Sequence, residues 1–156
     1  MTPMAVRVFR SPDDVASAVG EELGHSDWLE ITQERIDAFA DATGDHQWIH
    51  VDPQRAARGP FGRTVAHGYL TLSLVPFLAG QIFAFDAPGA RLNYGTNKVR
   101  FPSPVPVGAR IRAHAAVEEV TDLPHGQQLV IRYTIEIEGH DKPGCVADAV
   151  VLLLSP

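Results

Sequence analysis

Residues 67–83 read HGYLTLSLVPFLAGQIF, and nearly every position in this stretch is apolar. As a helix it would extend roughly 25 Å, the width of a small domain. A helix that is hydrophobic almost all round has to be buried on most of its sides. Pro76 lies inside the stretch and lacks the backbone N–H that an unbroken helix needs, so we predict a kink or break there. The remainder of the chain is therefore expected to pack around this helix.

Four strand-like segments follow the apolar stretch. Residues 129–137 alternate apolar and mostly polar side chains, the pattern of a strand with one buried and one wet face. Residues 111–117 alternate in the same way, and residues 92–101 and 146–154 complete the set. Strands that follow helices favour an α+β fold with an antiparallel sheet. We expect four strands in meander order, wrapped around the central helix.

Helix-start signals precede this part of the chain. Ser11 can cap a helix whose first position is Pro12, and we expect a helical extension over residues 1–26 of a single domain spanning 1–156. Thr32 can cap a second helix, which would end at Gly44 because glycine suits the left-handed position after a helix. Asp45 would then be the first side chain beyond a helix end.

The composition of the chain limits the classes of function that are expected for it. The chain has 156 residues, a net charge of −6 and no basic run, so nucleic acid is not expected as a partner. Cys145 is the single cysteine, which excludes an internal disulfide, and its apolar surroundings favour a small buried side chain. The N-terminus lacks the apolar core of a secretory signal, and no apolar run is long enough to cross a membrane. We expect a cytoplasmic protein with no membrane partner.

The motif with the clearest chemistry is GDHQWIH, residues 44–50. Its Asp45 and His50 supply a carboxylate and an imidazole across a short turn, the two groups most suited to proton transfer near neutral pH. In a dry pocket, burial would raise the pKa of Asp45 and lower that of His50, bringing both toward neutrality. The alternative is purely structural: an Asp after a Gly often caps a turn, and a His can be an ordinary surface residue.

Two further features favour a site over a structural turn. Trp48 and Ile49 are large apolar residues inside a loop, which indicates that the loop faces an interior cavity. His67-Gly68 opens the apolar helix, so the Gly68 N–H would be an unpaired donor at its first turn. Such a donor suits a developing enolate oxygen, and the absence of a side chain permits close approach.

These motifs resemble the MaoC-like dehydratase family, which includes the (R)-specific enoyl-CoA hydratases and has the hotdog fold. The resemblance rests on TGDHQWIHVDP at residues 43–53 and AHGYL at 66–70, supported by YGTNKVRF at 94–101 and PVPVG at 104–108. It covers about residues 28–154. The usual family motif has Asn-Pro where this chain has Gln47-Trp48.

The resemblance implies an enzyme, a lyase of fatty acid metabolism that hydrates trans-2-enoyl thioesters reversibly to (R)-3-hydroxyacyl thioesters. Asp45 and His50 would hold the water, and the Gly68 N–H would bind the thioester carbonyl. Trp48, Tyr69 and Phe77 would bound the acyl tunnel.

The resemblance also bears on carrier and assembly. Coenzyme A or acyl carrier protein would carry the substrate, and no separate cofactor is expected. Arg63, Lys98 and Arg100 are candidates for binding coenzyme A phosphates, although solvated strand and loop charges explain them equally well. An exposed sheet edge and a wide apolar helix favour a homodimer, as the family does.

Other readings remain open from the residues alone. A hotdog thioesterase would use similar thioester geometry but hydrolyse the acyl group, and a non-catalytic acyl-thioester binding subunit would keep His50 behind a pocket blocked by Trp48. His46 and His50 have the i, i+4 spacing of a metal pair, but no third ligand is evident, so no metal is predicted. Ser73 lacks the context of a serine hydrolase.

Overall fold

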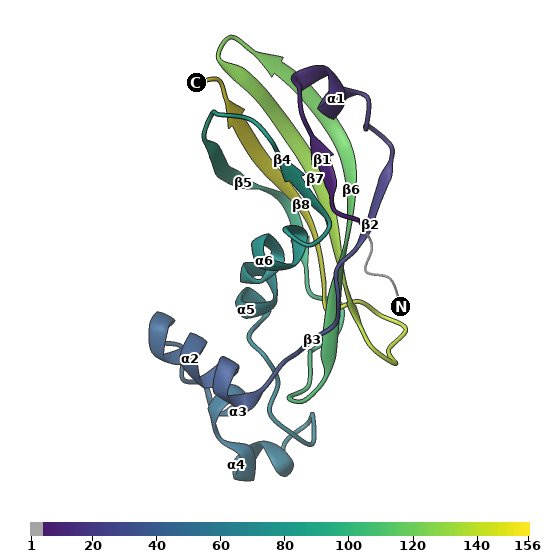
Figure 1. Ribbon diagram of the computed structural model, residues 1–156. Coiled ribbons are helices and arrows are strands. Elements are labelled where there is room, and N and C mark those ends of the chain that lie inside the picture. Colours follow the sequence, from purple (N-terminus) through teal and green to yellow (C-terminus); the bar gives the residue numbers. More distant parts are fainter. Residues whose placement is uncertain (1–4) are drawn as a thin grey trace.

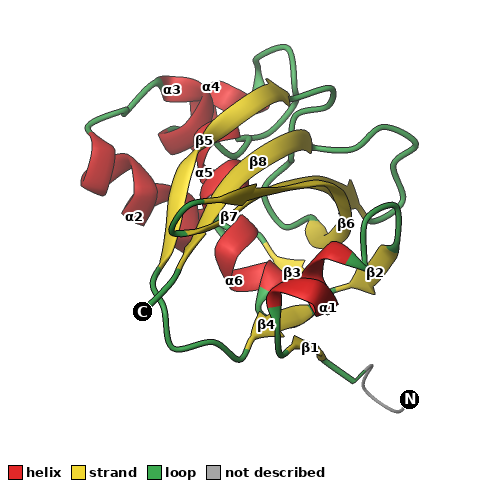
Figure 2. Ribbon diagram, turned by 90° about the horizontal axis from the view of Figure 1, so that it is seen from above, coloured by secondary structure: helices red, strands yellow, loops and turns green. Residues whose placement is uncertain are grey.

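Six strands form an antiparallel sheet that curves around two short helices, as Figures 1 and 2 show for this computed structural model. The structure describes residues 5–156. Along the sheet the strands are β2 (Glu22–His25), β6 (Arg110–Leu123), β7 (Gly126–Ile137), β8 (Cys145–Leu154) and β5 (Arg91–Arg100), and β3 (Leu29–Glu30) also pairs with β6. The predicted α+β class and wrapped antiparallel sheet are confirmed.

The apolar stretch forms two helices rather than one long helix. Helix α5 (Gly68–Ser73) and helix α6 (Val75–Ala79) meet at Leu74. The break follows from Pro76, which has no N–H to donate to the carbonyl four residues earlier. The predicted interruption is therefore confirmed. The prediction of one long helix is wrong, because the stretch forms two short ones.

The two central helices are also less enclosed than the sequence indicated. One side is buried against the sheet, where Leu78 is fully inaccessible to solvent. On the other side Tyr69 is 71% exposed and Phe77 is 58% exposed. The helices therefore present an apolar strip on the surface of the single chain.

The predicted meander is wrong in the placement of one strand. β6, β7 and β8 are sequential neighbours, but β5 pairs with β8 instead of β6. The loop between β5 and β6 crosses the end of the sheet and is tied to the segment before α5. Ala66 N–H donates to the Val105 carbonyl at 2.8 Å, and Val107 N–H donates to the Thr64 carbonyl at 2.9 Å. β2 and β3 occupy the edge of β6 in place of β5.

The N-terminal segment is part of the domain and is mostly not helical. β1 (Arg7–Phe9) pairs in parallel with β4 (Phe83–Phe85), and β2 joins the main sheet. The predicted helix is only α1 (Pro12–Ala16), capped by Ser11 as expected. Residues 1–4 of the predicted helical extension lie outside the described residues. The pairing of β1 with β4 and of β2 with β6, together with the burial of Phe9 in the core, accounts for these strands.

Three further helices gather at one end of the sheet, next to the start of α5 (Figure 1). They are α2 (Gln33–Thr43), α3 (Trp48–Val51) and α4 (Pro53–Ala57). Thr32 caps α2 through the N–H of Arg35, and Gly44 ends it at a φ of 83°, so both predicted boundaries are confirmed. None of the helices described is long and apolar enough to cross a membrane.

Shortening a core side chain of α6 should strongly destabilise the fold. Leu78→Ala removes a fully buried side chain from α6, and we expect the free energy of unfolding to fall by about 2–5 kcal/mol. Urea denaturation measures the change. The control is Val19→Ala, at a position 49% exposed, which should change stability by less than about 0.5 kcal/mol. Equal effects of the two substitutions would contradict the assignment of Leu78 to the core.

Candidate active site

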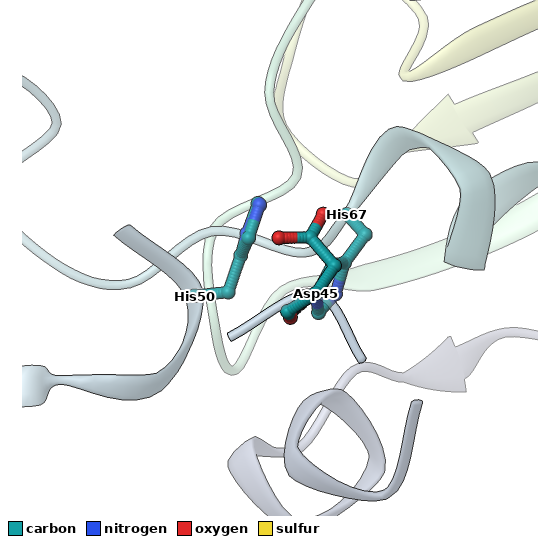
Figure 3. A group of neighbouring side chains, drawn as sticks. All are labelled: Asp45, His50 and His67. Carbon is teal, nitrogen blue, oxygen red and sulfur yellow. Dashed lines mark hydrogen bonds between the residues drawn. The ribbon is translucent and has the colours of Figure 1, made fainter. Parts of the chain in front are cut away.

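Three polar side chains from separate segments meet beside the start of α5 (Figure 3). Asp45 directly follows α2, His50 lies in α3, and His67 precedes α5. One carboxylate oxygen and one nitrogen of each ring lie within 4.8 Å of one another. Asp45 and His50 are predicted from the sequence, but the side chain of His67 is not. Its position directly before Gly68 is the one sequence feature that pointed to it.

His50 is held as a neutral base. Its side chain is buried, and its Nδ1 lies 2.6 Å from the Val65 carbonyl oxygen. Because a carbonyl only accepts, Nδ1 carries the proton, and Nε2 of the neutral ring keeps its lone pair. Burial lowers the pKa of His50 and His67 lowers it further, against opposing contributions from the Val65 hydrogen bond and Asp45. His50 therefore offers an unprotonated Nε2 at neutral pH.

A glutamine that the sequence analysis did not select fixes the backbone of His50. Gln33 Nε2 donates to the His50 carbonyl at 2.7 Å and to Asp37 Oδ1 at 2.9 Å. The buried Thr64 hydroxyl in turn donates to Gln33 Oε1 at 2.6 Å. Gln33 thus joins α2, α3 and the segment before α5 through one amide.

Asp45 is exposed in the single chain, so the burial expected for this carboxylate is not found there. The residues of the loop between α2 and α3 are exposed, which leaves the side chain of Asp45 in contact with solvent. Its carboxylate points toward the His50 ring (Figure 3). Its backbone carbonyl accepts a hydrogen bond from His67 Nε2 at 2.9 Å. This hydrogen bond therefore fixes the position of the loop, even though the side chain of Asp45 is accessible to solvent.

Gly68 supplies a backbone donor at a position where a side chain would press on a neighbouring ring. A Cβ at this position would lie 2.9 Å from the ring of Phe101. As the first residue of α5, Gly68 has no acceptor within its own helix, and its N–H meets no other acceptor among residues 5–156. Gly68 therefore presents a backbone donor directly after His67, and its role toward a substrate carbonyl remains a prediction.

Trp48 and Tyr69 lie at different depths. The Arg55 guanidinium stacks 4.4 Å from the Trp48 ring centre, and a Cβ on Gly59 would come within 2.9 Å of the same ring. Trp48 therefore fills the space under the loop that follows α4. Tyr69 lies on the surface with its ring edge toward Phe101, at a centroid distance of 6.2 Å. These contacts are with protein groups, and a role for either ring toward an acyl chain remains a prediction.

The three cationic candidates do not form one cluster. Lys98 and Arg100 line a shallow hollow on the sheet together with Arg132 and Asp148. Arg63 does not contribute to that hollow and lies exposed in the loop before α5. Lys98 and Arg100 are close in sequence to Phe101, which contacts Gly68, so their end of β5 adjoins the site.

The arrangement is poorly suited to a metal ion. His50 and His67 stack with ring centres 3.8 Å apart at 22°, and the in-plane lone pairs of nearly parallel rings do not converge on one point. The i, i+4 partner considered for His50 is also engaged elsewhere. His46 Nε2 lies 2.9 Å from Asp41 Oδ1, a hydrogen bond that raises the pKa of His46.

Comparisons with known proteins agree on one family. Residues 14–139 match the family model described as MaoC like domain. The chain is 54% identical to 3-hydroxyacyl-thioester dehydratase Z of Mycobacterium tuberculosis over 94% of this chain and 97% of that protein. It is 45% identical to nodulation protein N of Rhizobium leguminosarum bv. viciae, with 90% and 89% covered.

A solved structure supports the same conclusion. The (R)-hydratase from A. caviae involved in PHA biosynthesis superposes with a TM-score of 0.67 at 28% identity, covering 83% of this chain and 95% of that one. Given a family model matched over most of its length and relatives of this similarity, the chain belongs to the MaoC-like dehydratases, lyases with the hotdog fold.

Proposed function

We propose that this protein is an (R)-specific enoyl-thioester hydratase. It adds water reversibly to trans-2-enoyl thioesters to give (R)-3-hydroxyacyl thioesters. The observation that carries the proposal is the convergence of two proton acceptors, Asp45 and His50 Nε2, beside the unpaired Gly68 N–H. The names of the M. tuberculosis dehydratase and the A. caviae (R)-hydratase support the same reaction class.

The acceptors define how a water would be held. A carboxylate and an unprotonated Nε2 can each accept one hydrogen bond from the same water. The water's two O–H bonds are then directed at Asp45 and His50, and its oxygen lone pair is free to attack C3 of the substrate. The Gly68 N–H would bind the thioester carbonyl and stabilise the enolate, a contribution of roughly 3–4 kcal/mol for a donor of this kind.

The proton balance needs only these groups. Asp45 takes a proton from the water as the hydroxyl bonds to C3, and the electron pair of the double bond moves into the enolate. His50 orients the water through Nε2. The enolate collapses as C2 receives a proton from the Asp45–His50 pair, which returns the site to its starting state.

The substrate is carried as a thioester of coenzyme A or of an acyl carrier protein, so no resident cofactor is required. Lys98 and Arg100 at the end of β5 would meet the phosphates of the carrier. The Asp148 carboxylate in the same hollow is paired with Arg132, and the exposure of Lys98 and Arg100 makes their contact with the carrier a solvent-screened one.

We also propose a homodimer formed along β5. Nine of the ten residues of this strand are exposed, and it lies at the end of the sheet order. Exposed apolar side chains accompany it: Tyr94 is 67% exposed on the strand itself, and Tyr69 and Phe77 flank it on the central helices. A long, bare edge strand is a pairing site unless it is covered. A partner seated there would lie beside Phe101, and therefore beside the approach to Gly68.

The assignment of the base is tested by Asp45→Asn. Asparagine keeps the size of the side chain but cannot take a proton, so we expect kcat to fall at least about 1000-fold with an unchanged Tm. The assay follows loss of enoyl absorbance with crotonyl-CoA, with chiral analysis of the product. Asp41→Asn, an exposed carboxylate on α2, is the matched control and should stay within twofold of wild type. Wild-type activity in Asp45→Asn would rule out the assignment, and free-thiol release instead of hydration would indicate a thioesterase.

The protonation of His50 is tested by its pH dependence. Because burial lowers its pKa below the ordinary value of 6.5, the neutral form persists as the pH falls through 6.5 and is lost only at lower pH. We expect the acid limb of kcat/KM that reports His50 to have its midpoint below pH 6.5. Histidine-selective NMR titration measures the midpoint directly. A midpoint at or above pH 6.5 would contradict the lowered pKa on which the role of His50 as a neutral acceptor rests.

The dimer is tested by charging the exposed edge. Tyr94→Asp places a carboxylate on the proposed interface, and we expect the variant to elute as a monomer where the wild type elutes as a dimer. Light scattering coupled to gel filtration measures both masses. Leu123→Asp, at a position 37% exposed on the β6–β7 hairpin, is the control and should remain dimeric. A monomeric wild type would refute the proposal.

A further inference from the structure

We infer that His67 is a positioning residue that holds the Asp45 loop and the His50 ring in the relative positions that the proposed reaction requires. The inference rests on the proposed hydration at this site. Its basis is a pair of contacts made by one side chain: a hydrogen bond to the Asp45 backbone and a ring stack on His50. His67 is 2% exposed and so does not reach the bulk solvent.

The first contact fixes the loop that carries the proposed base. His67 Nε2 donates to the Asp45 carbonyl at 2.9 Å, across 22 residues of sequence. The side chain of Asp45 is exposed, and its one side-chain hydrogen bond is a long one, 3.3 Å from the Gln47 N–H. The bond from His67 is therefore the tertiary anchor of this loop. A displacement of about 1 Å in a catalytic group can cost 100-fold in rate.

The second contact fixes the plane of the other catalytic ring. The His50 and His67 rings are stacked at 3.8 Å, and Phe39 of α2 packs on His67 at 4.9 Å. His50 is thus held by the Val65 hydrogen bond in its plane and by His67 across its face. The direction in which Nε2 points follows from these two restraints.

The hydrogen bonds assign opposite tautomers to the two rings. His50 carries its proton on Nδ1 because it donates to Val65, and His67 carries its proton on Nε2 because it donates to Asp45. His67 Nδ1 is buried without a partner within residues 5–156, so a second proton on this ring would find no acceptor there. The ionisable groups that face His50 are Asp45 from the loop after α2 and His67 from the segment before α5.

Two substitutions separate the two contacts. His67→Phe keeps a ring against His50 but removes the donor to Asp45, and His67→Gln keeps an amide donor but removes the ring. We expect His67→Phe to lower kcat about 10- to 100-fold with KM within about threefold, and His67→Gln to recover part of that loss. His125→Gln, in the exposed β6–β7 turn, is the control and should behave as wild type.

The pH profile distinguishes positioning from simple packing. The Asp45 carboxylate raises the pKa of His50, so release of the Asp45 loop by loss of the His67 donor should lower the NMR midpoint of His50 and move the acid limb of kcat/KM to lower pH, more in His67→Phe than in His67→Gln. A residue that served only to fill space would lower Tm without moving that limb. Unchanged kcat and an unchanged limb in both folded variants would overturn the inference.

Long-range ¹H–¹⁵N NMR of the wild-type enzyme supplies a test that requires no variant to fold. We expect the Nδ1–H tautomer for His50 and the Nε2–H tautomer for His67 at neutral pH, and the reverse assignment for His67 would overturn the inference. If the wild type does not hydrate enoyl thioesters, the proposed function fails while the tautomers still decide whether His67 holds Asp45. If the wild type is active and the tautomers differ from these, the inference alone fails.

Discussion

Four consecutive buried residues, Thr64 to His67, hold the candidate active site together. Their backbone is hydrogen-bonded to α3 on one side, through Val65 and Ile49, and to the β5–β6 loop on the other, through Ala66 and Val105. Their side chains reach α2 through Gln33 and the Asp45 loop through His67. Since every group proposed for catalysis is attached to this segment, its burial sets the geometry of the site.

The sheet provides the rigid support for that segment. β6, β7 and β8 form long antiparallel ladders whose inner side chains are buried against α5 and α6. The proline-rich loop after β5 returns across the end of the sheet and places Phe101 against Gly68. The position of the backbone donor is thus determined by the end of one strand and the beginning of one helix, rather than by a flexible loop.

The division of the central helix has a consequence for the surface. Pro76 interrupts the backbone hydrogen bonds, and the two short helices that result expose Tyr69 and Phe77 beside the bare edge of β5. The same surface adjoins the approach to Gly68. The departure from the usual family motif at Trp48 is accommodated by stacking against Arg55 and Gly59, which leaves Asp45 and His50 together.

Local features could be predicted from the residues alone: the Thr32 and Gly44 boundaries of α2, the interruption at Pro76, the strand alternation, and the placement of Asp45 just past a helix. Each depends on interactions within a few residues, which composition and spacing reveal. The place of β5 beside β8, the strands in the N-terminal segment, and the contacts of Gln33 and His67 depend on pairings between residues distant in the chain. The hydrogen bond from His67 to Asp45 spans 22 residues and has no counterpart in the periodicity of the sequence, because it forms only when the folded chain brings the two segments together.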